Sequence, residues 1–201
     1  MTANPRETVV TIEEENPEAK TGKIALRIPP NSVVFRLDMS NKGEFLTKSP
    51  FLHPGKKMLH KGCDYVVFCY YGGKYWFVLI ELKSKDTSGA VVQLCCSSVF
   101  IRYLRELLFL HDGKEIRYEL VYLLFSSRSN KMKTNLGNIK ESRRTMRSPV
   151  DSNSFYYYNL SLPFPRFTLS RLLDCEPQTE SPSPCDLFNR PRVVIPPSHI
   201  V

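Results

Sequence analysis

The fold is decided by residues 64–83, which read DYVVFCYYGGKYWFVLIELK. Two runs of aromatic and β-branched residues, 65–71 and 75–82, favour β-strands. Gly72-Gly73 lies between them, and two apolar runs joined by Gly-Gly predict a β-hairpin with a primed turn. We therefore expect this hairpin to form the core of a β-sheet.

The register of the hairpin places charged residues together at its open end. If the two glycines occupy the turn, Tyr71 faces Lys74, and counting back from that pair places Asp64 opposite Glu81. Residues that face each other in this way have Cβ atoms about 4.5–5.5 Å apart. Lys83 follows two residues after Glu81 and therefore lies on the same face of the strand.

Such a pair of carboxylates is suited to a divalent cation. Like charges directly opposite destabilise a sheet, and a cation between them removes the repulsion. Magnesium prefers oxygen ligands and uses one or two carboxylates together with waters and substrate phosphate. Lys83 would lie beside the metal, where it can orient the attacking water or stabilise charge on the scissile phosphate.

These residues resemble the signature of the PD-(D/E)xK nuclease superfamily, with Asp64 at the start of one strand and Glu81-Leu82-Lys83 on the next. The resemblance covers about residues 60–125. It implies an α/β fold with a restriction-endonuclease-like core, in which helices flank a central mixed β-sheet. It also implies that Asp64, Glu81 and the backbone carbonyl of Leu82 bind Mg²⁺ or Mn²⁺, and that Lys83 orients or activates water.

Three further features bear on the resemblance. Gln93, early in the next predicted helix, is expected as an auxiliary catalytic residue, because several branches of the superfamily place a glutamine near this point. Cys63 stands where the motif name has proline. An upstream helix often supplies an additional acid, and the sequence leaves open five candidates for it, which are Glu13, Glu14, Glu15, Glu18 and Glu44.

The rest of the chain supplies further elements around the hairpin. Apolar patterning predicts a mostly buried helix over 90–110 and strands over 116–125 and 155–158. Upstream, 24–28 and 33–37 predict two strands or a hairpin around Pro29-Pro30. The expected organisation is a polar N-terminal extension over 1–23, a nuclease-like domain over 24–162 and a proline-rich C-terminal tail over 163–201.

Charge and composition favour a polyanionic partner. The chain of 201 residues has a net charge of +8, and its 42% hydrophobic content excludes a fully disordered protein. Most of the net charge of the chain lies in 128–150, which we expect to be a basic mobile loop. The residues expected to bind nucleic acid are Lys85, Lys131, Lys133, Lys140, Arg143, Arg144 and Arg147.

Other classes of protein are disfavoured. No apolar run approaches the ~20 residues that span a bilayer, and the polar N-terminus is unlike a signal peptide. The six cysteines form no CxxC pair, so no zinc signature is present and reduced thiols in the cytoplasm are expected.

The expected function is Mg²⁺- or Mn²⁺-dependent hydrolysis of phosphodiester bonds by a DNA endonuclease, with RNA left open as the polymer. A homodimer or a subunit of a larger nucleic-acid-processing complex is the expected assembly, without a membrane partner. Two alternatives remain. One is a catalytically inactive nucleic-acid-binding subunit on the same fold, and the other is a protein-interaction adaptor that uses the proline-rich tail and aromatic surface.

Overall fold

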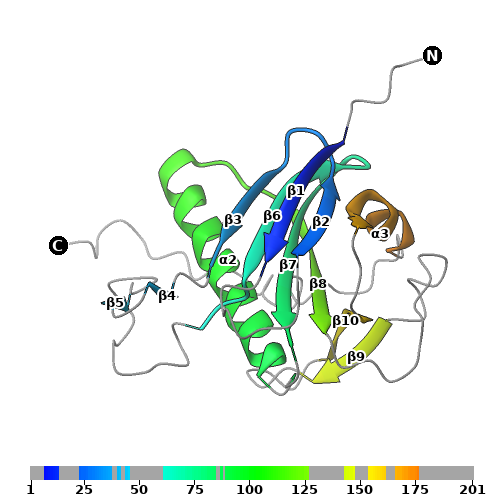
Figure 1. Ribbon diagram of the computed structural model, residues 1–201. Helices are drawn as coiled ribbons and strands as arrows, with labels where there is room; N and C mark the ends of the chain where they lie inside the picture. Colours follow the sequence, from blue (N-terminus) through cyan, green and yellow to red (C-terminus); the bar gives the residue numbers. More distant parts are fainter. Residues whose placement is uncertain are drawn as a thin grey trace, which may run out of the picture.

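The chain forms a mixed α/β structure (Figure 1). The computed structural model describes residues 7–13, 23–37, 40–41, 44–45, 61–84, 87, 89–126, 143–147, 154–161 and 166–176. The strands are β1 (Thr8–Glu13), β2 (Lys23–Ile28), β3 (Val33–Arg36), β4 (Ser40–Asn41), β5 (Glu44–Phe45), β6 (Tyr65–Tyr71), β7 (Lys74–Lys83), β8 (Tyr118–Ser126), β9 (Arg143–Arg147), β10 (Ser154–Ser161) and β11 (Arg166–Thr168). The helices are α2 (Ala90–Asp112) and α3 (Leu169–Cys175).

The central sheet has six strands in the order β3-β6-β7-β8-β10-β9, and it is mixed. Strands β7, β8 and β10 are mutually parallel, whereas β6 runs antiparallel to both of its neighbours and β9 runs antiparallel to β10. A three-stranded sheet of order β1-β2-β11 and a two-stranded ribbon of β4 and β5 complete the strands. The mixed sheet expected from the sequence is therefore confirmed.

The β6–β7 hairpin has the predicted turn and register. Gly72 and Gly73 have φ of 59° and 81°, as a primed turn requires, and the facing pairs run from Tyr71 with Lys74 to Tyr65 with Ile80. A side chain other than glycine is strained in this region of φ, which explains why two glycines stand here.

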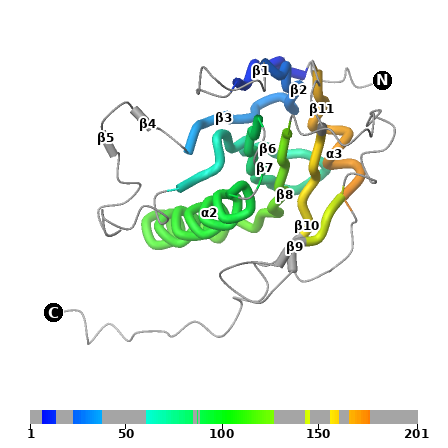
Figure 2. Tube along the Cα trace, turned by 60° about the horizontal axis from the view of Figure 1, so that its bottom comes forward, coloured from blue at the N-terminus to red at the C-terminus, as the bar shows by residue number. Residues whose placement is uncertain are grey.

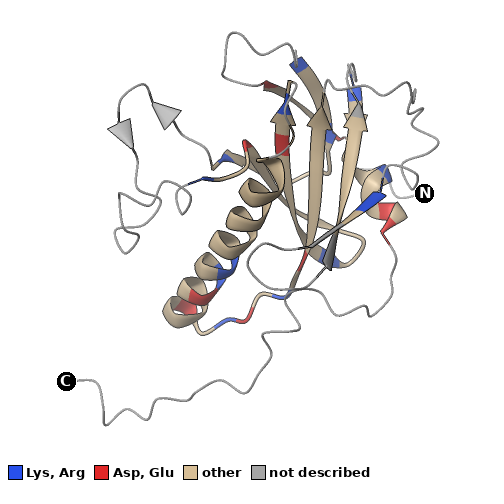
Figure 3. Ribbon diagram, turned by 90° about the horizontal axis from the view of Figure 1, so that it is seen from below, with Lys and Arg blue, Asp and Glu red and all other residues tan. Residues whose placement is uncertain are grey.

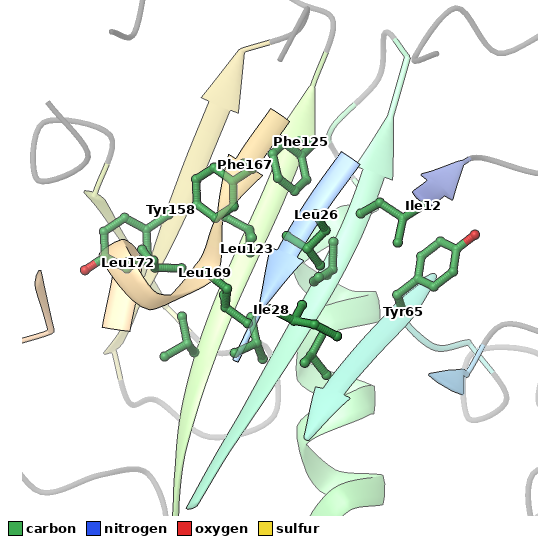
Figure 4. Packing of buried hydrophobic residues seen from close by; sticks show 14 of the residues in the cluster. Ile12, Leu26, Ile28, Tyr65, Leu123, Phe125, Tyr158, Phe167, Leu169 and Leu172 are labelled. Carbon is green, nitrogen blue, oxygen red and sulfur yellow. The ribbon is translucent and has the colours of Figure 1, made fainter. Parts of the chain in front are cut away.

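The two faces of the central sheet are buried in different ways (Figure 2). On the face that we call the helix face, Val66, Leu79 and Tyr122 pack with the side chains of α2. On the opposite face, which we call the small-sheet face, Val67, Ile80 and Leu123 pack against β1, β2, β11 and α3 (Figure 4). The alternation of side chains along a strand assigns each residue of the hairpin to one of these faces.

Helix α2 differs from its prediction at its C-terminal end. It ends at Asp112, and Gly113, the residue that follows, terminates it in a left-handed conformation with a φ of 66°. Its buried residues all lie between Ala90 and Ile101, while Leu107 and Leu110 are exposed. The prediction of a mostly buried helix is therefore wrong for the C-terminal half of α2. No helix in the described part of the chain is both long and apolar enough to cross a membrane.

Several expectations for the flanking segments are corrected. The two strands predicted around Pro29-Pro30 are confirmed as β2 and β3. They do not form a hairpin, because they belong to different sheets, and Asn31 takes a φ of 59° in the turn between them. Strand β1 lies within the expected N-terminal extension, and β11 and α3 lie within the expected tail. All three elements nevertheless contribute buried side chains to the hydrophobic cluster on the small-sheet face. The prediction of a loop is also wrong for 143–147, since this part of the basic segment is strand β9.

Candidate functional site

The candidate site lies at the open end of the β6–β7 hairpin. Asp64 directly precedes β6, and Glu81 and Lys83 are in the last three positions of β7. Leu79 packs on the helix face and Ile80 and Leu82 on the small-sheet face, so alternation places Glu81 and Lys83 on the helix face. The register that pairs Tyr65 with Ile80 places Asp64 opposite Glu81.

The three polar side chains make short contacts around Leu82. The Oδ2 atom of Asp64 accepts a hydrogen bond of 2.6 Å from the backbone N–H of Leu82. The Nζ atom of Lys83 lies 2.6 Å from Oε1 of Glu81. The side chain of Glu81 is fully buried, and that of Lys83 is 23% exposed. The structure therefore brings together the two predicted carboxylates, the predicted ammonium group and the backbone at Leu82.

Cys63 borders this group of charges. Burial raises the pKa of its thiol to about 12, and the negative charges of Glu81 and Asp64 also raise this pKa. Both carboxylates are therefore near enough to the Cys63 thiol to influence its pKa. At neutral pH the thiol stays protonated, so it adds no third negative charge to the site.

Helix α2 holds the chain segment that carries Asp64. The side-chain Nε2 of Gln93 donates a hydrogen bond of 3.1 Å to the carbonyl oxygen of Gly62. The hydroxyl of Ser97 accepts a hydrogen bond of 2.7 Å from the backbone N–H of Cys63 and donates one of 2.8 Å to the carbonyl of Gln93. Gln93 therefore contacts the backbone just before Asp64, which is a positioning contact.

Ser97 was not among the residues that the sequence singled out. In the sequence, Ser97 is marked only as a polar residue within the apolar first half of the predicted helix. In the structure it is fully buried. A serine in a helix can satisfy its own hydroxyl by bonding to the preceding turn, so that signal does not distinguish a tertiary contact.

The oxygen atoms at the site fit a small divalent cation. Asp64, Glu81 and the carbonyl of Leu82 would supply oxygen ligands of the kind that Mg²⁺ and Mn²⁺ prefer, and Mg²⁺ commonly retains several waters. Within the described residues, no group of three or more His, Cys, Asp or Glu side chains could hold a metal. The predicted donor set is two carboxylates and a backbone carbonyl, which are ligand types that Mg²⁺ takes together with waters.

Of the upstream acids, the side chain of one is described. The carboxylate of Glu13 lies 3.0 Å from Nζ of Lys23, and its backbone exchanges hydrogen bonds with the hydroxyl of Tyr65, which packs on the small-sheet face. Glu13 therefore lies across the sheet from the candidate site. Glu14, Glu15 and Glu18 and the side chain of Glu44 lie outside the described residues.

The predicted nucleic-acid-binding residues are described only in part. Lys85, Lys131, Lys133 and Lys140 lie outside the described residues, and Arg147 is described only as a position in β9. The guanidinium of Arg143 lies 3.9 Å from the ring centre of Tyr156. Arg144 is exposed and pairs across the ladder with Tyr157.

Comparison of the chain with protein-family models, with curated proteins and with solved structures finds no match in any of the three.

Proposed function

We propose that this protein is a metal-dependent nuclease that hydrolyses phosphodiester bonds, with DNA as the expected polymer. The observation that carries the proposal is the convergence of Asp64, Glu81 and Lys83 on one face at the end of the hairpin. The mixed sheet with α2 on one face agrees with a restriction-endonuclease-like core, although the opposite face is covered by a small sheet and α3.

The burial of Glu81 supports a functional origin for this arrangement. Removing a carboxylate and an ammonium group from water costs several kcal/mol per ion, and apolar residues of similar size are often at least as stabilising. The rest of β7 is almost entirely apolar, so Glu81 and Lys83 depart from the pattern of their own strand. Charged groups that stability does not require are typical of sites selected for chemistry.

Each residue of the site has a chemical role in this proposal. A bound Mg²⁺ or Mn²⁺ would supply Lewis acidity toward the scissile phosphate, and Asp64, Glu81 and the Leu82 carbonyl would hold it. The N–H of Leu82 orients the Asp64 carboxylate. The ammonium of Lys83, aligned by Glu81, donates hydrogen bonds to the attacking water or to a phosphate oxygen.

A cleavage assay tests the proposal. Purified protein is incubated with supercoiled plasmid, labelled linear DNA and labelled RNA in Mg²⁺, in Mn²⁺ and in EDTA. We expect cleavage with either metal and none in EDTA, and we expect Asp64→Asn, Glu81→Gln and Lys83→Met each to lower the rate by about 100-fold or more.

The matched control is Lys74→Met, which removes a lysine from the other end of the same strand. Lys74 is half exposed and lies 3.8 Å from Glu119, so its loss should leave the rate unchanged. Binding of nucleic acid without cleavage by the wild-type protein would refute the nuclease and support an inactive binding subunit. Equal cleavage by all four variants would also refute it.

A further inference from the structure

A patch of apolar side chains lies at the turn end of the β6–β7 hairpin, on the helix face. Phe77 packs with the helix-face cluster, and Tyr75, two residues before it on β7, has the same orientation. Directly facing residues of an antiparallel pair project to the same side. The residues that face these two on β6, and the one that faces Phe68 on β3, complete what we call the turn-end patch, which consists of Val33, Phe68, Tyr70, Tyr75 and Phe77.

The rings of the turn-end patch form one continuous surface. The ring centre of Phe68 lies 5.6 Å from that of Tyr75 and 4.6 Å from that of Phe77. The ring centres of Tyr70 and Tyr75 are 5.0 Å apart. Tyr70 is 58% exposed and Tyr75 is 42% exposed, and Val33 is exposed as well. Contiguous exposed apolar side chains, unlike single ones, mark interaction surfaces.

Helix α2 packs on the helix face only through its first half. Its last buried residue is Ile101. Leu108 follows Ile101 by about two turns and therefore lies on the same side of the helix, yet it is 47% exposed. The side of α2 that is covered at Ile101 is thus partly open at Leu108.

The charges beside the turn-end patch balance each other. The ring of Tyr118, at the start of β8, lies 5.0 Å from that of Phe77. Residues of both signs alternate from the end of α2 to this tyrosine, as Figure 3 shows, and they are Asp112, Lys114, Glu115 and Arg117. A balanced surface does not attract a polyanion, so the patch fits an uncharged apolar segment better than it fits nucleic acid.

The chain leaves the described structure close to this patch. The described residues end at Glu176, and the carboxylate of Asp174 accepts a hydrogen bond of 2.8 Å from the hydroxyl of Tyr71. Tyr71 adjoins Tyr70 and packs on the small-sheet face. Residues 177–190 span up to about 50 Å when extended, whereas packed sheets lie only about 10 Å apart. Residues 191–197 are therefore within reach of the patch around the end of the hairpin.

The chemistry of residues 191–197 matches the turn-end patch. Their sequence is Pro-Arg-Val-Val-Ile-Pro-Pro, in which the arginine is the one charged residue. Proline-rich segments bind surfaces lined by aromatic side chains, because proline restricts the backbone before binding and lowers its entropic cost. A segment tethered to its own binding surface also has an effective concentration in the millimolar range. A second copy of the chain lacks this advantage.

We propose that residues 191–197 bind the turn-end patch of the same chain, with their proline and aliphatic side chains against the rings of Tyr70 and Tyr75. This inference is independent of the proposed nuclease activity. It joins two features that an adaptor would present separately, the proline-rich tail and the aromatic surface. Another protein that binds the patch would have to displace this segment first.

Photo-crosslinking in the full chain tests the inference. The photoreactive residue p-benzoylphenylalanine replaces Ile195, the protein is irradiated, and the crosslinked peptides are mapped by mass spectrometry. We expect a crosslink within one chain to residues 68–77. The double variant Tyr70→Ser, Tyr75→Ser should lower its yield by about fivefold or more, because the segment loses both exposed rings.

The matched control is Tyr156→Ser, which should leave the yield unchanged. Tyr156 is 50% exposed and lies two residues before Tyr158 of the small-sheet core, so it removes an exposed ring from the opposite face. A crosslink to any other part of the chain, no crosslink, or crosslinks only between two copies would each overturn the inference. The position mapped with Tyr70 and Tyr75 intact decides it even if the double variant fails to fold.

Discussion

At the scale of single residues, the buried ion pair of Glu81 and Lys83 carries a clear cost to folding stability, because both charges are removed from water. The carboxylate is fully buried and its ammonium partner is mostly buried, at 2.6 Å. Breaking such a pair by removing one partner is usually destabilising by about 3–5 kcal/mol, because one charge stays buried alone. Replacing both partners by apolar residues is often neutral or stabilising.

We therefore predict different stabilities for single and double variants at this site. Lys83→Met should lower the free energy of unfolding by about 3 kcal/mol at neutral pH, whereas the double variant Glu81→Leu, Lys83→Met should be as stable as the wild type or more so. Urea denaturation followed by circular dichroism measures both. A double variant that loses as much stability as Lys83→Met would contradict the argument.

The carboxylates and lysine could be predicted because two simple rules determine their placement. The Gly72-Gly73 turn sets the register, and the period of two along β7 puts Glu81 and Lys83 on one face. Ser97 could not be predicted in this way. Its partner, the N–H of Cys63, is 34 residues away, and the contact depends on how α2 lies across the sheet.

At the scale of elements, the first turns of α2 form hydrogen bonds with the segment that precedes Asp64. Ser97 connects the helix to the backbone of Cys63, whereas the hydroxyl of Ser98 donates to Cys95 within the same helix at 2.8 Å. Both serines are buried. Ser97 and Ser98 therefore differ mainly in that the hydroxyl of Ser97 bonds to a segment outside the helix, whereas that of Ser98 bonds only within it.

We predict that Ser97→Ala lowers the free energy of unfolding by about 2 kcal/mol, because it leaves the buried N–H of Cys63 without its acceptor. Ser98→Ala should cost less than about 1 kcal/mol, since its bond lies within one helix. Chemical denaturation gives both values, and amide hydrogen exchange at Cys63 should accelerate only in Ser97→Ala. Equal effects of the two substitutions would argue against this role of Ser97.

The elements with strong local patterns were predictable. The hairpin and the start of α2 have apolar patterns that need no distant partner to interpret. Strand β9 has the sequence Arg-Arg-Thr-Met-Arg, and nothing in this composition indicates a strand. It exists as a strand because β10 provides a partner for its backbone, which is a tertiary contact.

At the scale of the whole molecule, β2 and the β11–α3 segment are distant in sequence and pack together in the hydrophobic core. Strand β11 adds in parallel to β2, pairing Phe167 with Leu26, and α3 follows directly and buries Leu169, Leu172 and Leu173. Figure 4 shows Phe167, Leu169 and Leu172 packed over the small-sheet face. The proline-rich region expected to be a tail therefore begins with part of the hydrophobic core.

We predict that Leu172→Ala lowers the free energy of unfolding by about 2–5 kcal/mol, as the loss of a fully buried leucine does in other cores. Leu110→Ala is the matched control, since this leucine is also helical but is 78% exposed, and it should change stability by less than about 0.5 kcal/mol. Thermal and urea unfolding measure both variants. Similar small effects would mean that α3 contributes little to the core.

The hairpin, its register and the meeting of two acids and a lysine at its open end follow from local sequence alone, because turn chemistry and side-chain alternation act over a few residues. Three features depend instead on long-range packing: β2 and β3 belong to different sheets, Ser97 bonds to the segment before Asp64, and Arg143 and Arg144 face opposite sides of the sheet. These features depend on the pairing and packing of segments far apart in the chain. No local pattern specifies which distant partner such a segment will meet.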